Sequence, residues 1–247
     1  MPHFHGRYID RVVVLTGAGI SAESGVPTFR DADGLWERHN PMDIATPEAF
    51  SRDPELVYRF YNARRSQLTR VQPNAAHRAL ARLQREFPGE VYLVTQNVDD
   101  LHERAGSTRV LHLHGELLKA RSTGPGGQVI PWRGDIRLGD RCRAGYQLRP
   151  HIVWFGEEVP LLGTAALLAS QAEVMIIVGT SMQVYPAAGL VHYKPPGVPL
   201  YFVDPAPQVS PGQFDSLEII CQRAAVGLPI LAGRLGNTGH GFSLPRP

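Results

Sequence analysis

Short apolar runs, rich in β-branched residues, alternate along the chain with longer segments in which apolar residues recur at helical spacing. The runs are too short to be buried helices and predict strands that are covered on both faces. They lie at residues 11–16, 91–95, 109–113, 174–178 and 200–204, with a further short strand at 219–220. Strands that alternate with helices in this way predict an α/β fold with a Rossmann-like, doubly wound parallel sheet.

The helical segments carry start and stop signals. Pro54 lies in the first turn of a helix expected over residues 54–69, where proline is favoured. A second helix is expected over residues 74–87, since its apolar residues recur at helical intervals and Pro88 ends the pattern. Further helices are expected at residues 101–105, 161–172, 186–191 and 224–235.

The first strand runs directly into the sequence Gly17-Ala18-Gly19-Ile20-Ser21-Ala22. Glycines at 17 and 19 permit a tight turn and a close approach to a ligand, and Ser21 can cap the helix that begins there. The spacing fits the dinucleotide fingerprint G-x-G-x-x-G/A, which places a pyrophosphate at a helix N-terminus. A glycine-rich turn without a ligand explains the same residues equally well.

Polar groups follow the other expected strands. They are Gln96-Asn97, His114, Gly179-Thr180-Ser181 and Asp204. In a parallel sheet these strand ends share one edge, where ligands bind. A dehydrogenase needs a ribose-binding acid about 20 residues after the glycine turn, but here a long loop over residues 26–36 and helices follow instead. We therefore expect a dinucleotide in a pose that does not serve hydride transfer.

Composition excludes several classes of protein. The chain of 247 residues has a net charge of +2, which is too close to neutral to favour nucleic-acid binding. No apolar run approaches the roughly 18 residues that span a bilayer, and the N-terminus lacks the apolar core of a signal peptide. Two cysteines, Cys142 and Cys221, fit a reducing cytoplasm and cannot form a disulfide framework. We expect a cytoplasmic protein that binds neither nucleic acid nor membrane.

Together these segments resemble the sirtuins, a family of NAD-dependent protein lysine deacylases. The matching motifs are Gly17–Arg30 (GAGISAESGVPTFR), Thr95–Asp99 (TQNVD), His112–Gly115 (HLHG), Val153–Gly156 (VWFG) and Gly179–Ser181 (GTS). They follow the family's order and cover the chain from about residue 11 to residue 235. The resemblance implies that NAD is bound and consumed as a co-substrate.

The resemblance also implies which residues hold NAD. They are Gly17, Ala18, Gly19, Ile20, Ser21, Ala22, Phe29, Arg30, Trp36, Gln96, Asn97, Val98, Asp99, Gly179, Thr180, Ser181, Asp204 and Ala224. Phe29 and Arg30 belong to the loop that closes over the nicotinamide ribose and excludes water.

By the same resemblance, His114 is the catalytic base. In the family, the acyl oxygen of a modified lysine attacks C1′ of the nicotinamide ribose, and the base then activates a ribose hydroxyl. The products are nicotinamide, O-acyl-ADP-ribose and free lysine. A pKa near 6.5 leaves a histidine largely neutral at pH 7. Strand alternation places His112 on the same side as His114, but the motif spacing selects the histidine before Gly115.

Two groups of residues are expected to bind the acyl-lysine substrate. The first is Val153, Trp154, Phe155 and Gly156, whose backbone can pair with a substrate peptide as an added strand. The second is Tyr61 and Arg64, which lie at i and i+3 of one helix and face the same way.

A guanidinium and a phenol suit the carboxylate of a succinyl or malonyl group. In this helix, Tyr-x-x-Arg resembles the bacterial desuccinylase and demalonylase subgroup of sirtuins, and acetyl removal is expected to persist. In the competing interpretation, Tyr61 packs in the core and Arg64 is a charged residue on the surface.

We expect residues 1–36, 71–114 and 150–247 to form the NAD-binding domain. Residues 37–70 and the zinc-ribbon-like insertion 115–149 form a smaller domain. Many sirtuins hold this insertion with zinc on four cysteines, but here Ser122 stands where the first pair begins and the second pair has only Cys142. We therefore predict no zinc. The candidates for an apolar cluster in its place are Val129, Ile130, Trp132, Ile136, Leu138, Tyr146 and Leu148.

Two other functions use the same motifs. A protein mono-ADP-ribosyltransferase shares the chemistry at C1′, and a non-catalytic NAD sensor keeps the glycine turn but needs no base. Acyl-lysine proteins or peptides are the expected partners, and we expect a monomer.

Overall fold

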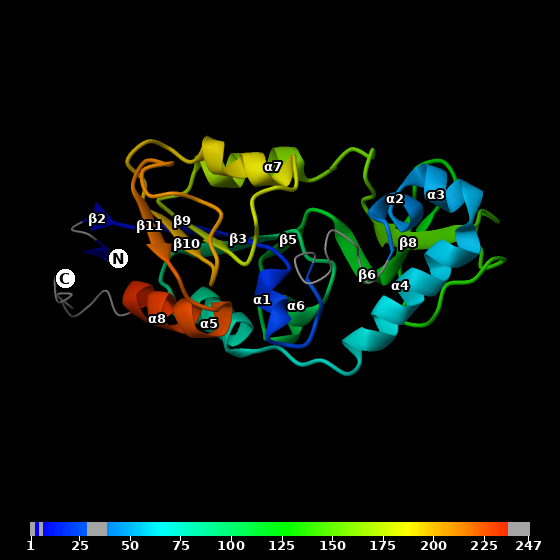
Figure 1. Cartoon of the computed structure of the whole chain (residues 1–247), viewed down its shortest axis with the longest axis horizontal. Coiled ribbons are helices and arrows are strands. Elements are labelled where there is room, and N and C mark those ends of the chain that lie inside the picture. The colour runs from blue at the N-terminus through cyan, green and yellow to red at the C-terminus, as the bar shows by residue number, and fades with distance from the viewer. Residues whose placement is uncertain (1–2, 5–6, 29–38, 237–247) are drawn as a thin grey trace.

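The computed structural model, which describes residues 3–4, 7–28 and 39–236, has a large parallel sheet and a smaller group of helices and strands at one end (Figure 1). The sheet has six strands in the order β11-β10-β9-β3-β4-β5, and every neighbouring pair is parallel. Their bounds are β3 (Arg11–Thr16), β4 (Glu90–Thr95), β5 (Val110–His112), β9 (Val174–Val178), β10 (Leu200–Val203) and β11 (Leu217–Ile220). The predicted doubly wound sheet is confirmed.

Helices cover both faces of this sheet. On one face Val12 and Val14 pack with α5 (Ala75–Glu86) and α8 (Ala224–Gly236); on the other, Val13 and Leu15 pack with α7 (Leu162–Ser170) and the 3₁₀ helix η2 (Ala187–Tyr193). Figure 1 shows α7 on one side of the sheet and α5 and α8 on the other. Because strand side chains alternate between faces, two covered faces require the unbroken apolar run seen in the sequence.

Between β3 and β4 the described residues form only helices, as the sequence predicted. These are α1 (Gly19–Ala22), α2 (Pro41–Ile44), α3 (Pro47–Arg52), α4 (Pro54–Leu68) and α5. We did not predict α2 and α3. Each is short and depends on a capping side chain, that of Asn40 or Thr46, followed by a proline in the first turn. The remaining short elements are β1 (His3–Phe4), β2 (Arg7–Tyr8) and α6 (Leu101–Arg104).

The smaller part pairs α2, α3 and α4 with an antiparallel sheet of order β7-β6-β8. Its strands are β6 (Gly115–Ser122), β7 (Val129–Pro131) and β8 (Leu148–Ile152). The strands expected from the sequence did not include these three. Polar and apolar residues are mixed along β6, which conceals a strand whose burial alternates only in part. The proposed domain boundaries stay a prediction.

The apolar cluster predicted for the small sheet is confirmed in part, and Ile130 and Trp132 pack against it as partly buried residues. Ile136 and Leu148 are buried in it with Ala120, Cys142 and Tyr58. Val129, Leu138 and Tyr146 are exposed instead. Tyr58, contributed by α4, takes their place and donates its hydroxyl proton to the Leu148 carbonyl at 2.6 Å. In the described part of the chain, none of the helices is long and apolar enough to cross a bilayer.

Candidate active site

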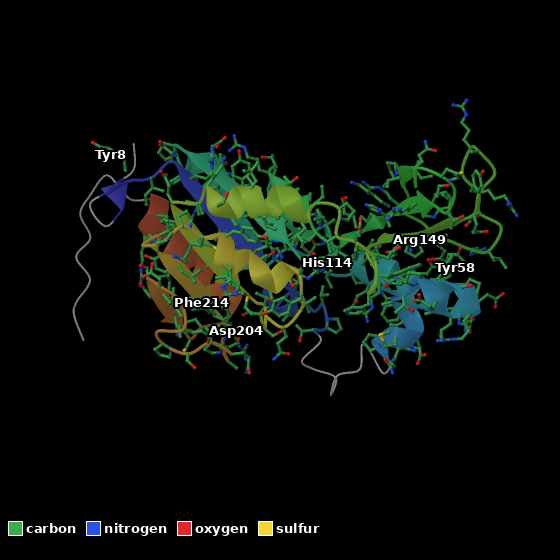
Figure 2. The ribbon with its side chains drawn as sticks, turned by 90° about the horizontal axis from the view of Figure 1, so that it is seen from above. Tyr8, Tyr58, His114, Arg149, Asp204 and Phe214 are labelled. Carbon is green, nitrogen blue, oxygen red and sulfur yellow. The ribbon has the colours of Figure 1, made fainter. Side chains whose placement is uncertain are left out.

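A cavity of about 680 Å³ lies at the carboxyl ends of the parallel strands and extends to the small sheet. Residues that follow β3, β4, β9 and β10 line one part of it, and residues of α4 and the segment after β8 line the other. In Figure 2, His114 lies between the two parts of the molecule, with Asp204 on one side and Arg149 on the other. The volume is within the range of small-molecule sites.

Most of the predicted site residues line this cavity. They are Gly17, Ala18, Gly19, Ala22, Gln96, Asn97, Val98, Asp99, His114, Gly179, Thr180, Ser181, Asp204, Ala224, Tyr61, Arg64, Val153, Trp154, Phe155 and Gly156. Ile20 and Ser21 are fully buried behind the cavity wall. Phe29, Arg30 and Trp36 lie outside the described residues.

The glycine turn after β3 interlocks with a second glycine turn after β9. The Gly17 amide donates to the Val178 carbonyl at 3.0 Å, and the Gly19 amide donates to the Gly179 carbonyl at 2.7 Å. A Cβ on Gly19 would lie 2.7 Å from the Gly179 Cα. A Cβ on Gly179, whose φ is +64°, would lie 2.3 Å from the Ile20 nitrogen. Packing between the two turns therefore requires these glycines before any ligand is considered.

Ser21 supports the cavity wall from inside α1. The helix begins at Gly19 with Ala18 as its N-cap, so the prediction that Ser21 caps it was wrong. Instead the Ser21 hydroxyl donates to Asp99 Oδ2 at 2.9 Å and accepts from Asn97 Nδ2 at 3.1 Å. One buried hydroxyl thus orients two polar side chains that line the cavity.

Two further contacts fix polar groups of the wall. Burial raises the pKa of Asp99, and hydrogen bonds from the Leu101 amide and the Ser21 hydroxyl offset part of that rise. Across the strand ends, Gln96 Nε2 donates to Thr180 Oγ1 at 3.1 Å. The loops after β4 and β9 are therefore tied together at the cavity.

Two buried histidines lie beneath this wall. His77 Nδ1 accepts from the Asn74 amide at 3.3 Å, so its proton is on Nε2, which faces the Ser21 hydroxyl at 3.4 Å. His102 Nε2 lies 3.1 Å from Thr16 Oγ1, and the two imidazole rings are 5.0 Å apart. His77 thus contacts Ser21, which orients Asn97 and Asp99, and His102 contacts Thr16, whose hydroxyl donates to Thr95 Oγ1 at 2.8 Å.

Both histidines are held in the neutral form. Burial, and then the nearby charge of Arg78, lowers the pKa of His77 to about 4. Burial also lowers the pKa of His102. Sequence analysis did not single out His77. Its signal was the spacing Asn74-x-x-His77, a capping box in which glutamate or glutamine is usual at the last position.

His114 presents a neutral imidazole to the cavity. Its Nδ1 lies 3.1 Å from the Gln96 carbonyl, which can only accept, so the proton is on Nδ1 and the lone pair on Nε2. Burial lowers the pKa of His114, although the Gln96 carbonyl acts in the opposite direction. Its own carbonyl accepts from the Val153 amide at 2.9 Å. This protonation state is the one that a general base needs.

His112 does not line the cavity. Strand β5 ends at His112, so the alternation that placed it beside His114 does not continue. Its Nδ1 contacts the Asn97 carbonyl at 3.0 Å and its Nε2 contacts Glu103 Oε1 at 2.8 Å. Burial favours a lower pKa for His112, but the Glu103 carboxylate, the Asn97 carbonyl and the Glu116 charge together outweigh it, and the pKa is raised.

Tyr61 and Arg64 lie one turn apart on α4, and both line the cavity. Arg64 is only 5% exposed, so the interpretation of it as a surface charge was wrong. Burial lowers the pKa of Arg64 to about 10, and its guanidinium lies 5.1 Å from the centroid of the Phe60 ring. Burial raises the pKa of Tyr61, which keeps its phenol protonated. A cation and a neutral donor therefore share this end of the cavity.

The adjacent Arg65 is also buried but is directed elsewhere. Its Nε donates to the Leu117 carbonyl at 2.6 Å and its Nη1 donates to Asn62 Oδ1 at 2.7 Å. It is not a lining residue. Arg64 is therefore the arginine of the pair that faces the cavity.

The segment after β8 has its amides already engaged. The Val153, Trp154 and Phe155 amides donate to the His114 carbonyl, the Glu157 carboxylate and the Ala45 carbonyl, at 2.9, 2.8 and 2.9 Å respectively. A peptide strand that pairs with this segment is therefore restricted to its carbonyl oxygens or the Gly156 amide.

At the opposite end, Asp204 is 3% exposed and accepts from the Ala206 amide at 2.8 Å. Glu23 accepts from the Ala225 amide at 2.8 Å and also lines the cavity. Other lining residues had no motif to mark them. They include Gln67, Leu68, Ala45, Leu117, Val184, Tyr185, Pro186, Pro205 and Arg223.

No group of three or more His, Cys, Asp or Glu side chains in the described residues is arranged to hold a metal ion. In the small sheet, the Ser122 hydroxyl donates to the Cys142 sulfur at 3.3 Å. Ser122 and Cys142, which stand where other sirtuin-like sequences have zinc cysteines, therefore contact each other directly.

The chain is similar to proteins of known family. Residues 17–186 match the model of the Sir2 family. An "NAD-dependent protein deacylase" of Helicobacter pylori is 55% identical over 197 residues, which are 80% of this chain and 85% of the relative. A protein of the same name from Bacteroides thetaiotaomicron is 48% identical over 226 residues, which are 89% of this chain and 95% of the relative.

A solved structure has the same fold. The crystal structure of a Sir2 homologue in complex with NAD superposes with a TM-score of 0.80 and 39% identity. The match covers 92% of this chain and 90% of the other.

The buried His77 predicts an acid-sensitive fold. In the unfolded chain it takes a proton near pH 6.5, but in the folded protein only near pH 4. Stability is therefore complete above pH 6.5 and is lost as the pH falls toward 4, by ~3 kcal/mol for a shift of this size. Urea unfolding across this range is expected to show a shallower pH dependence for His77→Gln. His192→Gln, at an exposed histidine, is the control, and an unchanged slope in His77→Gln would contradict the assignment.

Proposed function

The chain belongs to the Sir2 family, and we propose that it is an NAD-dependent protein lysine deacylase. It removes acyl groups from lysine side chains of proteins and consumes NAD, with nicotinamide, O-acyl-ADP-ribose and free lysine as products. The observation that carries the proposal is that the neutral imidazole of His114 shares one cavity with the interlocked glycine turns.

The cavity suits a dinucleotide. Turns at the ends of β3 and β9 approach it with backbone instead of side chains, which lets a pyrophosphate come close. Asp204 offers a carboxylate to ribose hydroxyls at one end, and Asn97 and Asp99 lie nearer to His114. When bound, NAD supplies an electrophilic sugar carbon as nicotinamide departs. Ile20 and Ser21 contribute from behind the wall and not by direct contact.

His114 acts as the base. Because the protonated Nδ1 of His114 donates a hydrogen bond to the Gln96 carbonyl, the unprotonated Nε2 can accept the proton of a ribose hydroxyl. The lowered pKa of His114 keeps the imidazole neutral at physiological pH. The Val153 amide holds the backbone of His114, which fixes the base next to the segment expected to bind substrate.

The acyl group is a short dicarboxylic one, succinyl or malonyl, and acetyl is also removed. Support comes from Tyr61 and Arg64, which bring a donor and a cation to the far end of the cavity. A buried guanidinium interacts strongly with a carboxylate because water does not screen the pair. An acetyl group needs no such partner and fits the same cavity.

The partners in this proposal are acyl-lysine proteins or peptides. The expected monomeric state, the cytoplasmic location and the exclusion of nucleic acid stay predictions.

A panel of lysine peptides carrying acetyl, malonyl, succinyl or no acyl group tests the activity. With NAD, the acylated peptides are expected to give nicotinamide and O-acyl-ADP-ribose. Loss of the base in His114→Tyr is expected to lower turnover by about 10²- to 10⁴-fold, with NAD binding retained in calorimetry. His192→Tyr, at an exposed histidine, is the control. ADP-ribose attached to protein without deacylation would point to the mono-ADP-ribosyltransferase instead, and NAD binding without turnover to a sensor.

Arg64→Met is expected to separate the acyl substrates. Loss of a charge-assisted contact of about 1.5–3 kcal/mol lowers kcat/KM for succinyl peptide by ~10- to 100-fold. Activity on the matched acetyl peptide should stay close to that of the unaltered enzyme. Arg59→Met, an exposed arginine on the same helix, is the control. Equal losses on both peptides would show that Arg64 does not select the acyl group.

The small sheet is held together without zinc. Support comes from the buried cluster around Ile136 and Leu148 and from the contact between Ser122 and Cys142. Dialysis against a chelator is expected to leave the thermal unfolding temperature unchanged, and elemental analysis is expected to find no bound zinc. One zinc per chain after dialysis would overturn this.

A further inference from the structure

We propose that His112 positions part of the NAD site: as an imidazolium paired with Glu103, it holds the carbonyl of Asn97 and so fixes the loop after β4. The inference rests on the proposed function, because it concerns how the site for NAD in that enzyme is shaped. His112 does not line the cavity, whereas Asn97 and Asp99 of this loop do. It is therefore a positioning residue and acts through them.

Three consecutive carbonyls of the loop after β4, at residues 96–98, accept hydrogen bonds from residues 112–117. His114 Nδ1 donates to the first at 3.1 Å, His112 Nδ1 to the second at 3.0 Å and the Leu117 amide to the third at 2.8 Å. His112 thus supplies the middle one of three contacts that hold the loop against the end of β5 and the start of β6.

Both ring nitrogens of His112 face groups that accept. Nδ1 lies 3.0 Å from the Asn97 carbonyl, and Nε2 lies 2.8 Å from Glu103 Oε1. A backbone carbonyl has no proton to give. Burial favours a higher pKa for Glu103, but the hydrogen bond and charge of His112 outweigh it, so the pKa is lowered and the carboxylate is ionised. Each nitrogen of His112 therefore carries a proton, and the ring is an imidazolium.

The two histidines of the His112–Gly115 motif therefore differ in charge. Among the described contacts, His114 meets an acceptor at Nδ1, and burial lowers its pKa. His112 meets acceptors at both nitrogens, and these outweigh its burial and raise its pKa. Environments that separate two like groups in this way give them different tasks. The neutral ring suits a base, and the charged ring suits a fixed donor.

The charged groups around the His112 ring come from α6, β6 and the loop itself. Glu103 on α6 and Glu116 on β6 both favour the imidazolium, and Lys119 on β6 forms an ion pair with Glu116. His102, also on α6, is neutral because burial lowers its pKa. The His112 side chain is only 8% exposed, so its charge depends on the neighbouring carboxylates.

The charge of His112 also acts on Asp99 within the loop. Asp99 is buried, and burial raises its pKa. Hydrogen bonds from the Leu101 amide and the Ser21 hydroxyl, and then the charge of His112, act in the opposite direction. An ionised carboxylate at this position accepts hydrogen bonds from a ligand. His112 therefore supports the position of Asn97 and the ionised form of Asp99 together.

A purely structural role for His112 predicts a different order of variants. If only the filled volume mattered, His112→Gln would be tolerated better than His112→Asn, because glutamine is the larger residue. The positioning role predicts the reverse. An asparagine amide nitrogen can take the place of Nδ1 and donate to the Asn97 carbonyl, whereas that of glutamine takes the place of Nε2, toward Glu103.

Calorimetric titration with NAD alone, near pH 7, tests this order. We expect NAD to bind about 10-fold more weakly to His112→Gln, as for a lost hydrogen bond from a charged donor, and less than about 3-fold more weakly to His112→Asn. His192→Gln and His192→Asn, at an exposed histidine, are the matched controls. Equal losses in the two variants at position 112, or the better affinity in His112→Gln, would overturn the inference.

Nitrogen NMR of the ¹⁵N-histidine-labelled protein tests the charge directly. The His112 signals are those missing from His112→Asn, and near pH 7 both ring nitrogens are expected to carry protons. A neutral His112 ring at this pH would overturn the inference. If neither variant at position 112 folds, Glu103→Gln at a partly exposed position gives the readout, since one histidine should then lose its proton at a lower pH than in the unaltered protein. No such change would count against the pair.

The pH dependence of NAD binding provides a further readout. His112 is charged in the folded protein up to a pKa raised above its ordinary 6.5, so its contribution is present below that value and is lost as the pH rises through the raised pKa. Once deprotonated, the ring cannot donate to Asn97 and Glu103 together. NAD binding is expected to weaken over this range in the unaltered protein but to stay level in His112→Asn. The same alkaline loss in both would contradict the assignment.

NAD affinity and peptide turnover distinguish failure of this inference from failure of the proposed function. If NAD affinity depends on His112 as expected but no acyl peptide is turned over, the deacylase proposal is overturned and the positioning of the loop is supported. If acyl peptides are turned over but His112→Gln binds NAD as tightly as the unaltered enzyme, the deacylase stands and the inference fails.

Discussion

The contact between two glycine turns governs the geometry of the site. Gly19 and Gly179 meet with backbone against backbone, at a separation that leaves no space for a Cβ on either. This contact sets how closely the ends of β3 and β9 approach, and α1 begins at Gly19 itself. From that start, Ser21 falls beside Asp99. A larger residue at either turn would move the cavity wall as a unit.

Directional hydrogen bonds then give the wall a single arrangement. Buried polar groups are costly unless each donor meets an acceptor. Around Ser21, the contacts with His77, Asn97 and Asp99 can be satisfied by one assignment of protons, which requires a neutral His77. Such a network resists deformation because no member can turn without leaving another unpaired. Preorganisation of this kind lowers the cost of binding a flexible dinucleotide.

Local signals allowed much of the fold to be predicted. The run Val12–Leu15 is apolar on both sides, so β3 and its place within a covered sheet could be predicted from the pattern alone. The i and i+3 spacing placed Tyr61 and Arg64 on one side of a helix, and both line the cavity. By contrast, β6 mixes polar and apolar residues, because it belongs to a small sheet that is partly exposed.

Contacts between distant segments could not be predicted in this way. His77 and Ser21 are 56 positions apart, and Trp154 and Tyr61 are 93 apart. No local pattern marks such pairs, since each residue has an ordinary role in its own element. The motifs identified residues that line the cavity, but the contacts that connect Ser21 with His77 and Trp154 with Tyr61 became visible only in three dimensions.

His114 also occupies a mechanical position. It directly precedes β6, the central strand of the small sheet, and its carbonyl accepts from the Val153 amide just beyond the neighbouring strand β8, so these two strands meet at this residue. A rotation of the small sheet about this junction would displace residues in proportion to their distance from it. The part of the cavity lined by Tyr61 and Arg64 would then move further than the imidazole. For a rotation about this junction, His114 would thus be the fulcrum.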